Sequence, residues 1–215
     1  MTNSRSAADV RLWPRVVLVV LALLAGGRMI ADGGAHTGDA PRPSAADAFG
    51  TTGGQGAAPA VGSLPPSEPS RVKIKAIDVD APLTGLDRDA NNTLQAPPDD
   101  DANLAGWDEN GITPGSTGTA VIAAHLDTAE GPAAFYGLSS LHKDNTVDVT
   151  RADGRTAVFT VDAVEEYEKD DFPSEKVYRN ATRAELRLIT CGGNYTKKNG
   201  YSGNVVVYAH LTGVS

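Results

Sequence analysis

Cysteine, clustered positive charge and long apolar runs are all scarce in this chain. Its 215 residues include one cysteine, Cys191, so no disulfide can form within the chain. The formal net charge is −8, and no group of Lys and Arg residues is interleaved with aromatic residues to attract phosphates. These absences argue against nucleic acids and other polyanions as partners.

The N-terminus holds the longest apolar run, from Val16 to Ala25, which is shorter than the ~20 residues of an upright membrane-spanning helix. Arg5, Arg11 and Arg15 precede it, and positive charge before an apolar segment places the start of a chain in the cytoplasm. A cleaved signal peptide and an uncleaved anchor both remain open. Because no clear small-x-small cleavage site follows, we favour a single-pass anchor within residues 1–30. The rest of the chain then lies on the extracellular face of the cell membrane.

Residues 31–70 are rich in Gly, Ala, Pro, Ser and Thr and contain almost no large apolar side chains, as in GTTGGQGAAPAVGSLPPSEPS. Such a stretch buries too little surface to offset the conformational entropy that folding removes. We therefore predict a flexible, disordered tether between the membrane and a folded domain that begins at residue 71.

Residues 71–215 change to short apolar runs, several of which alternate with polar residues. Alternation is typical of half-buried strands, and the connections are rich in Pro, Gly, Asp and Asn. Helices are expected only as short segments, near Phe135–Leu141 and near Thr182–Ala184. The predicted strands are RVKIKAI, TAVIAAH, NTVDVTR, TAVFTVDAVEEY, AELRLITC and NVVVYAHL. This pattern predicts an all-β fold, a closed or nearly closed barrel with short helices.

Two reactive side chains end predicted strands. His125 ends TAVIAAH and Cys191 ends LRLITC, and strand ends on a rigid scaffold are common positions for a site. A thiolate can attack a carbonyl carbon while an imidazole carries the proton of the leaving group, so the pair suffices for acyl transfer. Taken alone, such residues are more often an inert buried cysteine and a hydrogen-bonded structural histidine. Outside the cell, an unpaired thiol is either a reactive group or an intermolecular disulfide partner.

Five segments of residues 71–215 together carry a resemblance to a known family. They are RVKIKAIDVDAPL, NNTLQAPPDDDANLAGW, VIAAHLD, FYGLSSLHKDNTVDV and LITC. These segments resemble, in the same order, those of the sortases, the membrane-anchored cysteine transpeptidases of Gram-positive bacteria, and specifically the class F group of actinobacteria. LITC matches Leu-x-Thr-Cys of the signature Thr-Leu-x-Thr-Cys, with Arg187 in place of the first Thr. The resemblance implies the sortase β-barrel, preceded by an N-terminal membrane segment and a tether.

By this resemblance the chain is a transpeptidase that needs no metal or organic cofactor. Cys191 attacks the Thr-Gly carbonyl of an LPXTG-like sorting signal and forms a thioester, while His125 protonates the departing amine. An amine on a peptidoglycan precursor then resolves the thioester. The implied partners are therefore proteins with LPXTG-like sorting signals and this amine acceptor.

The chain departs from the family pattern at Asn204. In sortases an Arg on the strand after the Cys holds the substrate or stabilises the oxyanion, and Asn204 occupies that position here. An amide can donate a hydrogen bond to an oxyanion but brings no positive charge. The alternative, that Asn204 merely begins a strand, remains open. Arg187 and Arg183 lie nearby but have no motif that supports the role.

Asp127 and Thr190 are weaker candidates for substrate binding. Asp127 lies two residues beyond His125, where it would touch the imidazole or the substrate, or would simply be solvated. Thr190 would present its hydroxyl to the substrate carbonyl, or would pack within its strand. Gly192 and Gly193 would let the chain turn sharply after the cysteine.

No metal site is predicted, because the acidic stretch EEYEKDD lacks the ordered spacing of a calcium loop and is typical of an acidic surface.

A hypothesis from another functional class is a membrane-tethered, non-catalytic envelope β-domain that binds cell-wall components. The anchor, tether and barrel suit this hypothesis equally well. It leaves unexplained why His125 and Cys191 occur together in these segments.

Overall fold

The computed structural model describes residues 40–50, 61–90 and 93–215. The predicted anchor within residues 1–30 lies outside these ranges, as do parts of the predicted tether. Within the ranges, no helix has the length and apolar character needed to cross a membrane.

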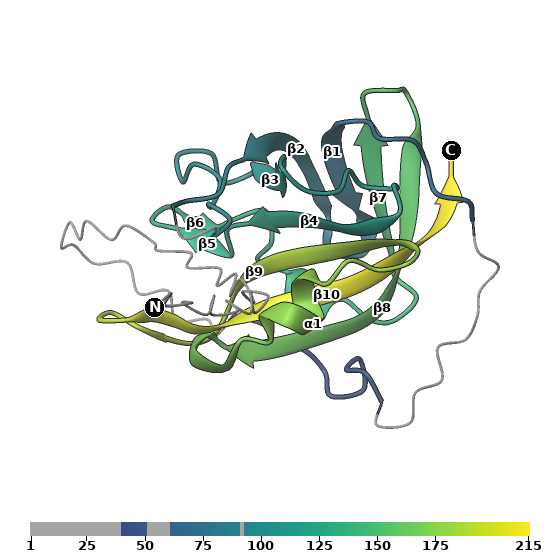
Figure 1. Ribbon diagram of the computed structural model, residues 1–215. Helices are drawn as coiled ribbons and strands as arrows, with labels where there is room; N and C mark the ends of the chain where they lie inside the picture. The colour runs from purple at the N-terminus through teal and green to yellow at the C-terminus, as the bar shows by residue number, and fades with distance from the viewer. Residues whose placement is uncertain (1–39, 51–60, 91–92) are drawn as a thin grey trace, which may run out of the picture.

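Eight strands close into a barrel in the spatial order β1-β2-β3-β4-β9-β10-β8-β7, which confirms the predicted all-β barrel (Figure 1). Two neighbouring pairs, β2 with β3 and β4 with β9, are parallel, and the other pairs are antiparallel. The barrel strands are β1 Pro69–Ile74, β2 Val79–Leu86, β3 Ala105–Asp108, β4 Gly118–Ala124, β7 Thr146–Arg151, β8 Thr156–Glu168, β9 Ala184–Thr196 and β10 Gly200–Val214.

The remaining elements are short. Strands β5 (Asp127–Thr128) and β6 (Gly131–Pro132) form a separate two-stranded ribbon. The 3₁₀ turns are η1 (Lys75–Ile77), η2 (Leu138–Ser140) and η3 (Lys169–Asp171), and the α-helix of the described chain is α1 (Ser174–Tyr178).

Of the two predicted helical segments, the structure forms one and not the other. Within Phe135–Leu141 the chain forms the single 3₁₀ turn η2, as expected of a short helical segment. The prediction near Thr182–Ala184 is wrong, because Ala184 pairs with Gly118 and begins strand β9. Sheet pairing overrides a weak local helix preference there, and the helix α1 forms earlier, where Val177 can be buried.

The barrel interior follows the alternation of the sequence. On β7, Val147 and Val149 point inward opposite Phe159 and Ala157 of β8, and all four side chains are fully buried. Inward residues of β9 and β10, among them Leu188 and Val207, complete the same core. This alternation is why sequence pattern alone predicts the strands.

A second apolar cluster covers the outside of the barrel wall formed by β4, β9 and β10, so these strands are buried on both faces over part of their length. We call this cluster the outer layer. Its buried members are Leu86, Leu94, Val121, Ala123, Ala163, Val177, Ile189, Val206 and Tyr208. Helix α1 contributes Val177 and packs over this wall (Figure 1). The outer layer shields the wall from water, which matters for the polar side chains at its edge.

Parts of the predicted tether contact the barrel. Val61 and Leu64 pack against the interior core, and the Leu64 amide donates to the Gly115 carbonyl. Further upstream, the carboxylate of Asp47 accepts hydrogen bonds from the ring of His142 and the amide of Lys143. In these two stretches the chain is held against the barrel, in contrast to the flexible tether that composition predicts.

Arg151 fixes the stretch at residues 61–68 to the barrel. The residue is 2% exposed, and its guanidinium donates to the carbonyls of Pro65 and Pro114. Replacing it in Arg151→Met keeps an apolar side chain but leaves both carbonyls without this donor, so we expect the free energy of unfolding in urea to fall by about 1–3 kcal/mol.

The matched control is Arg155→Met, since Arg155 pairs with the same Asp153 but has a 45% exposed side chain. We expect that control to change stability by less than about 0.5 kcal/mol. Equal effects of the two substitutions would contradict a special role for the buried guanidinium.

Candidate active site

The parallel pairing of β4 with β9 brings His125 level with Cys191. The pairing runs from Gly118 opposite Ala184 to Ala123 opposite Ile189, and His125 and Cys191 have the same sequence separation as each of these pairs. Beyond the last pair, the Thr190 hydroxyl donates to the Ala124 carbonyl at 2.8 Å, so the two chains stay together. The continued register places His125, one residue beyond the end of β4, level with Cys191 of β9.

Both side chains belong to the outer face of the barrel wall. Ala123 and Ile189 lie in the outer layer, and side chains two residues further along a strand emerge on the same face. Cys191 itself packs against the outer layer as a partly buried side chain. The pair therefore sits where the apolar cover of the wall ends.

A backbone carbonyl orients the imidazole of His125. Its Nε2 lies 2.8 Å from the carbonyl oxygen of Pro97. A carbonyl only accepts, so Nε2 carries the proton and donates it. In the neutral ring Nδ1 then remains as the nitrogen that can accept a proton.

Cys191 is a free thiol of intermediate exposure. Burial raises the pKa of this thiol, the positive charge of Lys169 lowers it, and the negative charge of Asp127 raises it further. The net pKa is above the ordinary value, so the thiol is protonated at neutral pH. Because the thiolate is the nucleophile, attack on a carbonyl needs a group that removes this proton.

Asn204 lies directly opposite Cys191 on the antiparallel strand β10, and Tyr167 of β8 lies opposite Asn204 on its other side. Directly opposite residues share a face of the sheet. Asn204 is 1% exposed, and its Oδ1 has no hydrogen-bond partner among the described residues. The predicted site residue is thus beside the thiol, with an unpaired amide oxygen.

Asp127 is neither solvated nor bonded to the imidazole. Its Oδ2 accepts a hydrogen bond from the hydroxyl of Tyr201 at 2.5 Å. Burial and this hydrogen bond raise the pKa of Tyr201, so the phenol stays protonated and donates. Sequence reasoning missed Tyr201, because nothing local links the start of β10 to the loop beyond His125.

Thr190 does not present its hydroxyl at the surface that carries Cys191. It is fully buried, and its hydroxyl is used in the bond to Ala124. This geometry matches the alternative of packing within the strand. Thr190 contributes by holding β9 against the continuation of β4.

The chain does not turn after Cys191. Strand β9 continues to Thr196, and residues 192–203 form an extended hairpin with the start of β10, which we call the hairpin arm and which projects from the barrel in Figure 1. The expected role of the two glycines is therefore corrected. The register shifts between Tyr201 and Gly203, and Gly193 has φ +80°. A Cβ at Gly193 would lie 2.4 Å from the Ser202 Oγ, so this bulge requires glycine.

The two arginines near the site are engaged elsewhere. Arg187 pairs with Glu185 at 2.8 Å and stacks on the ring of Tyr208. Arg183 pairs with Glu185 and with Asp162. Neither guanidinium is available to replace the arginine that the family resemblance leads one to expect.

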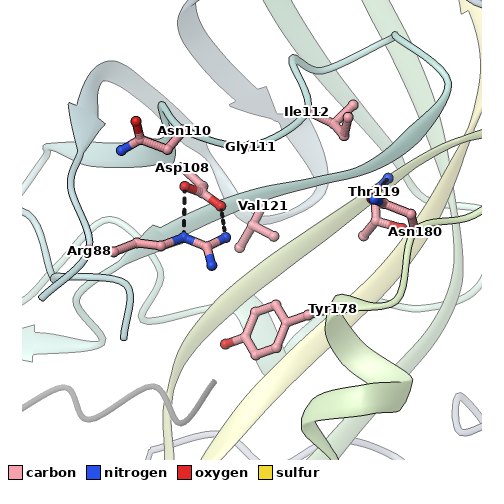
Figure 2. A pocket seen from close by; sticks show the side chains of 9 residues that line it. All are labelled: Arg88, Asp108, Asn110, Gly111, Ile112, Thr119, Val121, Tyr178 and Asn180. Atoms are coloured by element: carbon pink, nitrogen blue, oxygen red, sulfur yellow. Dashed lines mark hydrogen bonds and ion pairs between the residues drawn. The ribbon is translucent and has the colours of Figure 1, made fainter. Parts of the chain in front are cut away.

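A separate hollow of about 280 Å³ lies at the other end of β4 (Figure 2). Its walls carry the ion pair between Arg88 and Asp108 and the side chain of Tyr178, whose hydroxyl is buried without a partner among the described residues. The β4 residues in its lining are Thr119 and Val121, near the beginning of the strand whose far end leads to His125. None of the predicted site residues lines this hollow.

Comparisons with known proteins point to one family. A family model described as a sortase domain matches residues 72–212, whereas no curated protein matches. Among solved structures, a lid mutant of sortase A from Corynebacterium diphtheriae is 20% identical, with 66% of this chain and 69% of that chain covered and a TM-score of 0.52. Sortase C from Streptococcus pneumoniae is 22% identical over 67% and 68%, with a TM-score of 0.50. Sortase A from Listeria monocytogenes is 16% identical over 68% and 88%, with a TM-score of 0.50. At these identities the solved structures show a shared fold.

The bond from Tyr201 to Asp127 ties the hairpin arm to the loop that follows His125. Tyr201→Phe removes the donor and keeps the ring, so we expect amide hydrogen exchange in residues 192–203 to accelerate by about 10-fold or more, because a bond to a charged group is lost. Tyr195→Phe is the matched control, since that ring is 59% exposed and its hydroxyl has no hydrogen bond within the described chain. Unchanged exchange in Tyr201→Phe would show that the arm is held without this bond.

Proposed function

This chain belongs to the sortase family of cysteine transpeptidases, and we propose that it cleaves an LPXTG-like sorting signal between Thr and Gly and joins the substrate protein to an amine of the cell wall. The observation that carries the proposal is the shared register of β4 and β9, which sets His125 beside Cys191 on one face of the barrel. A nucleophile and a proton carrier in adjacent positions are the minimum requirement for acyl transfer.

The first half-reaction forms a thioester. Nδ1 of His125 takes the proton from the Cys191 Sγ, and the thiolate attacks the carbonyl carbon of the substrate Thr. The resulting oxyanion collapses, the bond from carbon to the Gly nitrogen breaks, and His125 returns the proton to the departing amine. The N-terminal part of the substrate remains attached to Sγ.

The second half-reaction releases the enzyme. An amine on a peptidoglycan precursor attacks the thioester carbonyl, and His125 removes a proton from the attacking nitrogen. The C–S bond breaks as the new amide forms, and the proton returns to Sγ. The apolar outer layer beside Cys191 limits access of water, which would otherwise hydrolyse the thioester.

Asn204 supports the electrostatic part of this mechanism in our proposal. Its amide lies opposite Cys191, and Oδ1 has no hydrogen bond among the described residues to fix the amide plane. A rotation about the last side-chain bond would exchange Oδ1 and Nδ2, so that the amide NH₂ is directed at the oxyanion. Asp127 acts indirectly, by holding the hairpin arm through Tyr201.

The sequence motifs also support an assignment to the class F group, and the N-terminal charge pattern supports an anchor that leaves the catalytic barrel on the extracellular face of a Gram-positive cell membrane.

The competing proposal is a non-catalytic envelope domain that binds wall components. It requires neither an oriented imidazole nor a thiol at the same register position, and both are present here.

Incubation of the full-length chain with an LPXTG peptide distinguishes the two proposals. We expect intact-mass spectrometry to detect a thioester adduct on wild-type protein, and no adduct or cleavage for Cys191→Ala. For His125→Ala we expect peptide cleavage to fall ~10²–10⁴-fold, the usual loss when a positioned proton-transfer group is removed.

Circular dichroism of both variants serves as the folding control, because neither side chain lies in the barrel core. Normal turnover by a folded Cys191→Ala protein would refute the transpeptidase proposal. Cleavage by His125→Ala within a few-fold of wild type would remove His125 from the mechanism while leaving Cys191 in it.

The role of Asn204 is tested by steady-state kinetics. If its amide donates to the oxyanion, Asn204→Ala should lower kcat by roughly 10²–10³-fold with little change in KM, since the bond is strongest in the transition state. Asn204→Arg, which introduces the family residue, should retain more activity than Asn204→Ala. A kcat for Asn204→Ala close to that of wild type would mean that other groups near Cys191 stabilise the oxyanion.

A further inference from the structure

The thiol of Cys191 is partly buried, and few charged groups face it. His125 follows the end of β4, Asp127 lies on β5, and Tyr201 lies at the start of β10. Lys169, on η3, lowers the pKa of the thiol, whereas burial and Asp127 raise it. The thiol thus has one negative group on one side and one lysine on another.

Lys169 directly follows strand β8, at the end of the wall that carries Cys191. Tyr167, Asn204 and Cys191 form one row across β8, β10 and β9. Tyr167 packs against the outer layer, and the next residue, Glu168, is extended with φ −63° and ψ 142°. Lys169 follows Glu168 as the first residue of η3, and η3 contacts β10, so the lysine lies at the end of the wall that carries Cys191.

The spacing of the sheet sets the distance between Lys169 and the thiol. In the row after Cys191, Glu168 pairs with Gly203, and Gly203 pairs with Gly192. With strands ~4.8 Å apart and ~3.3 Å per residue, the Cα atoms of Lys169 and Cys191 are roughly 12 Å apart. The long, flexible lysine side chain spans much of that distance.

Lys169 is half-buried, and within the described chain its ammonium has no hydrogen bond or ion pair. Neighbouring cations are different. Lys176 pairs with Glu165 at 2.7 Å, and Arg42 donates to the side chain of Asn194. Because no carboxylate of the described residues pairs with Lys169, its positive charge is not neutralised and acts on the thiol in full.

We propose that the ammonium group of Lys169 stabilises the anionic form of Cys191, and that it is the cation of this site. The inference deepens the proposed function, on which it rests for the role of Cys191 as nucleophile. Lys169 acts on the sulfur through space. It lies on the β10 side of Cys191, beyond Asn204, whereas His125 lies on the β4 side. It favours loss of the thiol proton before attack, and it places positive charge close to where the oxyanion develops.

The test measures the pKa of Cys191 from the pH dependence of its alkylation by iodoacetamide, in the full-length chain. Cys191 is the sole cysteine of the sequence, so the reagent reports on this one thiol. We expect Lys169→Met to raise the pKa of Cys191 by about 1, which slows alkylation at neutral pH about 10-fold. Lys169→Arg, which keeps the charge, should restore most of the reactivity.

Lys75→Met is the control for a change of net charge, because Lys75 is exposed on η1, between β1 and β2 and away from the site strands. It should leave the pKa of Cys191 at the wild-type value. An unchanged pKa in Lys169→Met would overturn the proposal, as would an equal rise in Lys169→Met and Lys169→Arg, which indicates a steric effect. Alkylation needs no sorting peptide, so failure of the proposed transpeptidation and failure of this inference are seen in different assays.

Discussion

The parallel pairing of β4 with β9 is the constraint on which the site depends. These strands are far apart in sequence, and hydrogen bonds along their length determine which residue of one lies beside which residue of the other. A slip by one residue would move every side chain of β9 to the other face, taking Cys191 into the barrel interior. The buried bond from Thr190 to Ala124 extends this register to the site itself. The position of the thiol is therefore a property of the whole barrel wall.

The outer layer also determines how far the thiol of Cys191 is removed from water. Most exposed faces of small antiparallel barrels meet water, but here apolar residues of β4, β9 and β10 are covered by α1 and by the segment that carries Leu94. The thiol at the edge of this layer is partly desolvated, which raises its pKa and makes each nearby charge more effective. Burial and Asp127 therefore raise the pKa of the Cys191 thiol, and Lys169 lowers it.

The groups around the thiol come from four separate parts of the chain. The carbonyl of Pro97 orients His125, Asp127 is held by Tyr201, and Lys169 follows the end of β8. The bulge at Gly193 keeps the hairpin arm paired next to Cys191. These parts meet because the strands that carry them are neighbours in the barrel.

The sequence by itself determined the all-β barrel, because alternation of apolar residues is a local signal, and it singled out Cys191 and His125 as candidate site residues, because each lies within a short contiguous motif. It predicted the wrong site for the second helix and ended β9 too early, since propensity is weak beside sheet pairing with β4 and β10. It did not predict roles for Pro97, Tyr201 and Lys169. The hydroxyl of Thr190, expected to face the substrate, donates instead to the Ala124 carbonyl within the wall. Only the tertiary structure decided these contacts, because each depends on the register between strands that are distant in sequence, and no local pattern encodes that register.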